Sequence, residues 1–123
     1  MYAWYFGGSV KINLFNSFED IEYLKKHSIN ICLDVCHLVL SANYFGKKWQ
    51  DWFKDLYPLA QHYHLADAEG IDGEGLQIGK GDIKNFSNFL KPKKMKIIEV
   101  WQAHHNKGYG FVEAISLLSK QKK

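Results

Sequence analysis

Residues 29 to 34 read Ile29-Asn-Ile-Cys-Leu-Asp34, a short run that is rich in apolar and β-branched residues and ends on a carboxylate. Such a run predicts a buried β-strand. Two later runs share the pattern, His62-Tyr-His-Leu-Ala-Asp67 and Lys96-Ile-Ile-Glu-Val-Trp101. The three runs start about 33 residues apart, which is the length of a strand, a helix and their two connections. The spacing therefore predicts adjacent parallel strands joined by helices.

Between and after these strands, apolar residues recur at helical spacing in four places: a segment that begins at Ser17, and residues 49–57, 86–90 and 111–118. Ser17 lies three residues before Asp20, which is typical of a capping box. Pro58 is expected to end the second helix. The aromatic run Tyr2 to Phe6 is predicted to be a further strand. The chain therefore reads as βαβαβαβα, a single α/β domain over residues 1–123 with a parallel sheet.

The composition is that of an ordinary globular domain, with 46% hydrophobic and 24% charged residues. The formal net charge of +3 comes entirely from lysine, because the chain contains no arginine. Arginine is the residue that grips phosphate and guanine with paired hydrogen bonds, so its absence disfavours a nucleic-acid partner. The chain shows neither a membrane-spanning run nor a signal peptide, and Cys32 and Cys36 form no disulfide framework. We therefore expect a cytoplasmic protein with no membrane partner and assign neither thiol a special role.

Polar residues lie at or near the carboxyl ends of the predicted strands, where α/β folds place their ligands. Asp34, His64 and Glu99 supply oxygen and nitrogen ligands that suit Zn, Mn or Mg. Glu99 is the most informative of them, because a carboxylate inside an apolar strand is costly unless it is paired or metal-bound. Two simpler interpretations stay open. Asp34 could cap the following helix beside a surface His37, and of His62 and His64 one could be buried and the other exposed.

A glycine-rich segment, residues 67–82, connects the second and third strands and contains five glycines. Such a segment is typical of a loop that brings its backbone close to an anionic ligand. It contains neither a strand followed by G-x-G-x-x-G nor a Walker lysine, which argues against a nucleotide. A sugar or sugar phosphate stays open as the ligand of this loop.

Four segments together resemble the xylose isomerase-like TIM barrels: Ile31-Cys-Leu-Asp-Val-Cys-His37, His62-Tyr-His-Leu-Ala-Asp67, Gly73-Glu-Gly-Leu-Gln-Ile-Gly-Lys-Gly-Asp-Ile83 and Ile98-Glu-Val-Trp-Gln102. That superfamily contains sugar phosphate isomerases and epimerases, ketose 3-epimerases and the endonuclease IV type of nuclease. The chain is most similar to the sugar isomerase/epimerase branch, including barrels associated with sialic-acid synthase-like proteins in surface polysaccharide pathways. The resemblance covers nearly the whole chain and implies a partial TIM barrel, about four parallel βα units corresponding to the C-terminal half.

The resemblance also implies roles for individual residues. Asp34, His64 and Glu99 would bind a divalent metal, and Glu99 would also be the catalytic acid/base. Glu74 stands where endonuclease IV carries a histidine, which disfavours the nuclease and its trinuclear zinc site. The candidate substrate-binding residues are His37, which could instead be a metal ligand, and His62, Asp67, Asp72 and Glu74.

Two departures from the family pattern shape the functional expectation. The family's other catalytic glutamate would fall near Ala3 to Tyr5, where there is no carboxylate, and the chain begins where the fifth barrel strand would begin. Four strands cannot close a barrel, so we expect a homo-oligomer or a complementary N-terminal half-barrel chain. The expected function is a metal-dependent sugar (phosphate) isomerase or epimerase that is inactive as an isolated half-barrel. The alternative is a non-catalytic half-barrel that serves as a binding module.

Overall fold

A computed structural model of the chain describes residues 17–91 and 93–121. The strand predicted over Tyr2 to Phe6 lies outside the described residues. In chain order the elements are α2 (Phe18–Lys26), β2 (Ile31–Asp34), α3 (Val35–Tyr44), α4 (Trp49–Leu56), β3 (Ala60–Leu65), β4 (Asp67–Glu69), β5 (Gly73–Leu76), α5 (Ser87–Leu90), β6 (Met95–Ile98) and α6 (His105–Lys120). No helix among the described residues combines the length and apolar character needed to cross a membrane.

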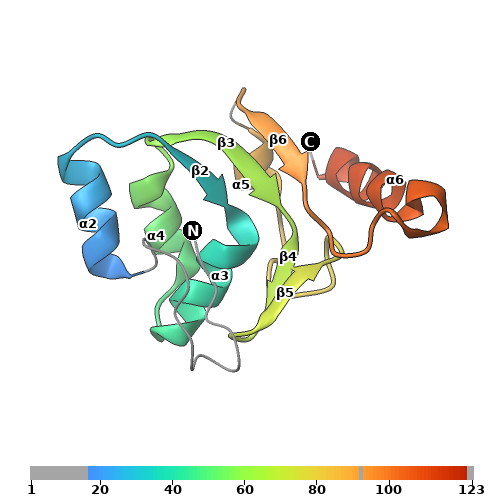
Figure 1. Cartoon of the computed structure of the whole chain (residues 1–123), viewed down its shortest axis with the longest axis horizontal. Coiled ribbons are helices and arrows are strands. Elements are labelled where there is room, and N and C mark those ends of the chain that lie inside the picture. The colour runs from blue at the N-terminus through green and yellow to red at the C-terminus, as the bar shows by residue number, and fades with distance from the viewer. Residues whose placement is uncertain (1–16, 92, 122–123) are drawn as a thin grey trace.

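The centre of the fold is a parallel sheet in the order β2-β3-β6 (Figure 1). Both strand pairs are parallel, which confirms the predicted arrangement of the three runs. Leu33, Tyr63 and Leu65 are fully buried in the core, and α3 packs against β2 and β3. Because side chains alternate across a strand, the residues between them belong to the opposite face of the sheet. The described residues form an open α/β layer and no closed barrel.

All three strands differ from their predicted bounds, and β2 begins at Ile31, two residues after the predicted start. β3 begins at Ala60 and ends at Leu65, two residues before the predicted end, and β6 ends at Ile98. The Glu99 N–H still donates to the Leu65 carbonyl at 3.0 Å, so the pairing persists one residue beyond β6. Asp67 therefore does not end the central strand. It begins β4, which pairs with β5 in a separate antiparallel sheet.

The glycine-rich segment folds around the carboxylate of Asp67, which is fully buried. Its two oxygens accept four backbone N–H groups at 2.9–3.0 Å, from Ala68, Gly79, Gly81 and Ile83. A side chain at Gly81 would collide with the Ala68 carbonyl oxygen, so this close approach requires glycine. The segment is thus an ordered hairpin and loop, where the sequence predicted only a loop.

The helices agree with the sequence except between residues 35 and 48. Ser17 and Asp20 form the predicted capping box, and α4 ends at Leu56, before Pro58. α3 had no predicted counterpart, because seven of its ten residues are buried and its sequence shows no polar face to reveal the period. α6 contains the predicted helix 111–118, but residues 106–108 near its start have positive φ angles of 50–79°.

Candidate metal centre

Asp34, His64 and Glu99 meet at the carboxyl ends of the three parallel strands. Asp34 is the last residue of β2, His64 lies one residue before the end of β3, and Glu99 follows β6 directly. One ligand atom from each lies within 4.8 Å of the other two. The closest pair is His64 Nδ1 and Glu99 Oε2, at 2.8 Å. Parallel pairing of Asp34 with His64 explains the convergence, because paired residues on neighbouring strands present their side chains to the same face.

Asp34 also caps helix α3, so one of the simpler interpretations holds beside the functional one. Its Oδ1 accepts the backbone N–H of His37 at 3.0 Å. Its Oδ2 lies 3.3 Å from His37 Nδ1, and His37 Nε2 lies 3.4 Å from Glu74 Oε2. His37 therefore bridges two carboxylates. Such outer contacts hold a ligating carboxylate in place and tune its basicity.

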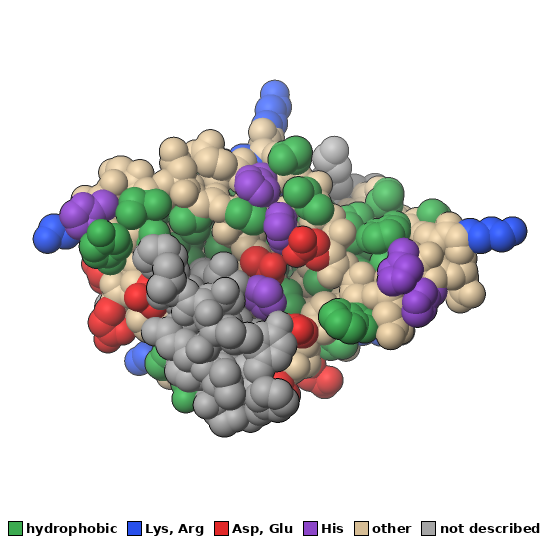
Figure 2. All heavy atoms as spheres, in the orientation of Figure 1, with side chains coloured by type: hydrophobic (Ala, Val, Ile, Leu, Met, Phe, Trp, Pro, Cys, Tyr) green, Lys and Arg blue, Asp and Glu red, His purple; other side chains and the backbone are tan. Residues whose placement is uncertain are grey.

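Asp34, His37, Glu74 and Glu99 line a hollow of about 150 Å³ together with Cys36, Ala66, Gly75 and Trp101, whereas His64 is not among its lining residues. Figure 2 shows histidine and acidic side chains gathered near the middle of this face of the molecule. Three of the lining residues, Asp34, Glu74 and Glu99, are acidic, and none of the described lining residues is a lysine. A concentration of negative charge favours the binding of a metal ion.

The donor set fits a divalent metal. Two carboxylates and one imidazole are the hard and borderline ligands that Mn, Zn and Mg accept. The Glu99 side chain is 45% exposed and can therefore adjust its position, while Asp34, at 14%, is held by the cap. Three protein ligands leave coordination positions open for water or substrate.

The exposure of Glu99 overturns one argument from the sequence. The run around Glu99 predicted a carboxylate inside an apolar strand, where it would be costly unless paired. In the structure β6 is an edge of the sheet, Met95 and Ile97 are 63% and 38% exposed, and Glu99 lies in contact with solvent. Its position therefore needs no metal to offset burial, and the case for a functional Glu99 rests on its contact with His64.

The other candidate substrate-binding residues have separate positions. His37 and Glu74 line the hollow. His62 is half-buried on β3, with its ring centroid 5.5 Å from that of His64. Asp72 is exposed in the turn between β4 and β5 and does not line the hollow. Asp67 is fully buried beneath backbone groups and offers a substrate no surface.

Two residues beside the centre were not singled out in the sequence. Trp101 lines the hollow with a side chain that is 69% exposed, and its backbone N–H donates to the Gly75 carbonyl at 2.7 Å. Cys32 lies on β2 and pairs with His62 on β3. Cys32 lies two residues before Asp34 on β2, so the alternation along that strand is the signal that could have found it. Trp101 lies in a turn beyond the end of β6, where strand alternation gives no signal.

The two thiols differ in their surroundings. Cys36 is buried in the core, and its Sγ accepts the Gly75 N–H at 3.2 Å. Burial raises the pKa of Cys36 to about 12. Burial also raises the pKa of Cys32, and the negative charge of Asp34 adds to the effect. Without a metal, both side chains are therefore neutral thiols at neutral pH.

Fold and site together define a parallel α/β domain with a candidate metal centre at the carboxyl ends of its strands. No family model, curated protein or solved structure matches the chain.

Proposed function

We propose that this chain is the C-terminal half of a metal-dependent sugar or sugar phosphate isomerase or epimerase, with its metal at Asp34, His64 and Glu99. One observation carries the proposal: the three side chains place ligand atoms within 4.8 Å of one another at the carboxyl ends of three parallel strands. The sequence resemblance to xylose isomerase-like barrels supplies the reaction class.

The bound metal would polarise a carbonyl and a neighbouring hydroxyl of the sugar. Glu99 would take the proton from the adjacent carbon on a carboxylate oxygen and return it after rearrangement. His64 Nδ1, 2.8 Å from Glu99 Oε2, orients that carboxylate. Among Asp67, Asp72 and Glu74, only Glu74 lines the hollow, so it is the candidate for the second acid/base group.

The volume of the hollow supports the proposal that the chain supplies only part of a sugar-binding pocket. The hollow of about 150 Å³ is smaller than the ~300–1,000 Å³ typical of small-molecule sites. Trp101 presents a largely exposed ring at its edge, and such a ring can pack against the apolar face of a sugar. Met95 and Ile97 are exposed on β6, where they pair with His62 and His64 of β3. A complementary half-barrel, from a second copy or another chain, would cover them and complete the wall.

Metal binding is the first test. Titration of the full chain with Mn²⁺, followed by electron paramagnetic resonance, should show one site. Asp34→Asn and Glu99→Gln should each weaken it by at least about tenfold. Glu69→Gln, which removes an exposed carboxylate that does not line the hollow, is the matched control and should bind like the wild type. Equal affinity in all four proteins would refute the metal centre.

Sugar binding is the second test. A sugar with a carbonyl beside a hydroxyl should displace metal-bound water and lower the water-proton relaxation of the Mn²⁺-loaded chain. A deoxy analogue that lacks the neighbouring hydroxyl is the control and should have a weaker effect. If a panel of ketoses, aldoses and their phosphates leaves the relaxation unchanged, the chain is a metal-binding module without a sugar site.

A further inference from the structure

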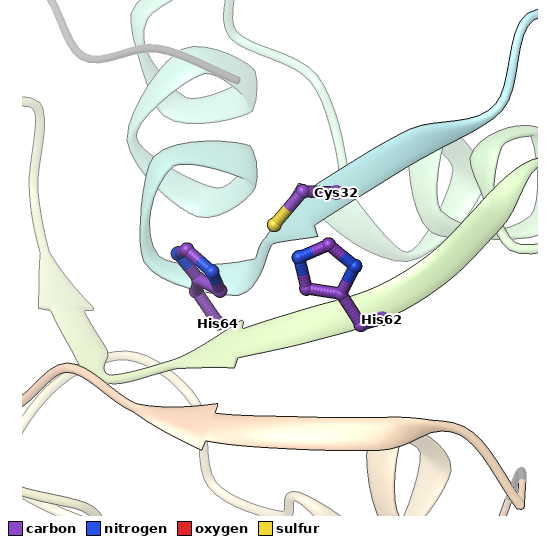
Figure 3. Close-up of side chains that lie close together, drawn as sticks. All are labelled: Cys32, His62 and His64. Atoms are coloured by element: carbon purple, nitrogen blue, oxygen red, sulfur yellow. The ribbon is translucent and has the colours of Figure 1, made fainter.

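A second group of metal-ligating side chains lies next to the candidate centre, on the face of the sheet opposite the buried Leu33 and Tyr63. It consists of Cys32 on β2 and His62 and His64 on β3. Figure 3 shows the Cys32 sulfur directed toward the space between the two imidazole rings. The parallel register explains the grouping. Cys32 pairs with His62, and Asp34 pairs with His64, so Cys32 and both rings share one face of the sheet.

The geometry of this group is close to that of a tetrahedral site. The sulfur and one nitrogen from each ring all lie within 4.8 Å of one another. Around a zinc ion, bonds of about 2.3 Å to sulfur and about 2.0 Å to nitrogen place the donor atoms roughly 3.5 Å apart. Side-chain rotation at these half-buried residues is the movement that would bring the donor atoms to this separation. The backbone needs no rearrangement, because the register of β2 and β3 already aligns the three residues.

We propose that Cys32, His62 and His64 form a second metal site, selective for a borderline-soft divalent ion of the zinc class. One thiolate and two imidazoles favour Zn²⁺ or Co²⁺ over Mn²⁺ and Mg²⁺, which prefer oxygen ligands. Binding deprotonates Cys32 and releases one proton to solvent, and three protein ligands leave a fourth position for water. The site goes beyond the proposed sugar chemistry and does not depend on it.

A third group, Asp34, Cys36 and His37, also has its ligand atoms within 4.8 Å of one another but is explained without a metal. The Cys36 sulfur is buried and already accepts the Gly75 N–H. His37 and Asp34 are joined by the helix cap and by their side-chain contact. Cys36 is therefore the natural control cysteine for a test of Cys32.

His64 belongs to both the oxygen-rich and the thiolate-containing group, which makes the two sites interdependent. Its Nδ1 contacts Glu99 Oε2 at 2.8 Å in the structure. A zinc-class ion held by Cys32 and His62 would recruit the same ring and withdraw it from Asp34 and Glu99. Occupation of the second site should therefore weaken Mn²⁺ binding at the first, and thermodynamic reciprocity requires the converse.

Cobalt provides a spectroscopic test in the full chain. One equivalent of Co²⁺ should produce the near-ultraviolet absorption of a cobalt–thiolate bond. Cys32→Ser should abolish this band, and His62→Gln should weaken Co²⁺ binding by at least about tenfold. Cys36→Ala should keep the band, as should Glu99→Gln. Far-ultraviolet circular dichroism without metal verifies that each variant is folded.

X-ray absorption of the zinc-loaded wild type tests the ligand set without any substitution. The expected first shell contains one sulfur and two imidazole nitrogens. A shell without sulfur would overturn the proposal, as would a cobalt–thiolate band that survives Cys32→Ser and disappears in Cys36→Ala.

The experiments distinguish an error in the first proposed metal site from an error in the second. If only the second site is wrong, Mn²⁺ binding still depends on Asp34 and Glu99, while the wild type shows no thiolate band. If only the first site is wrong, the thiolate band persists, and Mn²⁺ binding is insensitive to both carboxylates. Cys32→Ser should leave Mn²⁺ affinity unchanged and remove the antagonism by zinc.

Discussion

Asp67 shows at the scale of one residue how a polar side chain can serve the fold instead of a ligand. It is fully buried, and the partners of its two oxygens are four backbone N–H groups. A carboxylate can accept all four bonds, because each oxygen takes two of them. The charge stays buried at tolerable cost since it is surrounded by donors. Asp67 thereby holds together the loop that follows β5.

Replacement of Asp67 by Asn should destabilise the protein by about 3 kcal/mol. The amide nitrogen of Asn would take the place of one carboxylate oxygen, and because it is a donor it cannot accept the two backbone N–H groups that this oxygen accepts. Urea unfolding of Asp67→Asn and wild type measures the difference. Asp72→Asn is the control and should change the free energy of unfolding by less than about 0.5 kcal/mol, since Asp72 is exposed. A stable Asp67→Asn protein would contradict the structural role.

Buried Cys36 and Tyr63 predict a loss of stability at alkaline pH. Burial raises the pKa of each to about 12 in the folded chain. The unfolded chain releases these protons near pH 9 and pH 10, so above those values it binds fewer protons than the folded chain. The free energy of unfolding should therefore be unaffected by these groups below about pH 8.5 and fall as the pH rises toward about 12.

Urea unfolding at several pH values between about 8 and 11 measures this slope, which can reach about 1.4 kcal/mol per pH unit for each group. Cys36→Ala and Tyr63→Phe should each flatten it. A slope that is identical in wild type and both variants would show that neither group is responsible.

At the scale of the element, α3 links the fold to the site. The helix is almost entirely buried, begins directly after β2 and is capped by Asp34. Because the capping residue is also the last residue of a strand, its side chain stays at the carboxyl edge of the sheet. The local requirement of a helix start therefore also positions a candidate metal ligand.

The two tasks of Asp34 can be separated by substitution. Asparagine is as good a helix cap as aspartate, so Asp34→Asn should leave the free energy of unfolding within about 0.5 kcal/mol of wild type and still weaken Mn²⁺ binding. Asp34→Ala removes the cap as well and should cost about 1 kcal/mol in stability. Thermal unfolding and Mn²⁺ titration of the three proteins compare these effects. Equal loss of stability in both variants would show that the charge, and not the cap, stabilises α3.

At the scale of the whole molecule, the parallel sheet carries Cys32, Asp34, His62 and His64 on the face opposite the buried Leu33 and Tyr63. β6 exposes Met95 and Ile97, which pair with His62 and His64, and Trp101 lines the hollow beyond the end of β6. Substrate orientation by a complete pocket contributes several kcal/mol to catalysis. The described residues supply only part of such a wall.

The isolated chain should therefore show no isomerase or epimerase turnover. Purified protein is incubated with Mn²⁺ and a panel of ketoses and sugar phosphates in deuterated water, and deuterium incorporation at the reacting carbon is followed by NMR. We expect no exchange above the metal-only background. Exchange that disappears in Glu99→Gln would contradict this prediction and show that the chain, alone or self-assembled, is an active enzyme.

The sequence by itself determined the features that depend on short-range pattern. Apolar runs at a spacing of about 33 residues predicted the parallel strands β2, β3 and β6. The capping box at Ser17 and the amphipathic stripe before Pro58 predicted two helices. The rule that parallel strands end at the same edge nominated Asp34, His37, His64, Asp67 and Glu99 for one edge of the sheet, and the family resemblance selected Asp34, His64 and Glu99 as metal ligands.

Tertiary structure alone decided the features that depend on which segments meet. The buried helix α3 has no polar face to mark its period, and the loop after the β4–β5 hairpin is held by the Asp67 carboxylate, which accepts from backbone donors up to sixteen residues away. The grouping of Cys32 with His62 and His64 depends on the register between two strands, which no single segment encodes. Likewise, Glu99 is exposed because β6 lies at the edge of the sheet. The pattern of apolar and polar residues predicts the local secondary structure of a segment. Strand order and register, in contrast, are determined only when the segments pack together in the core.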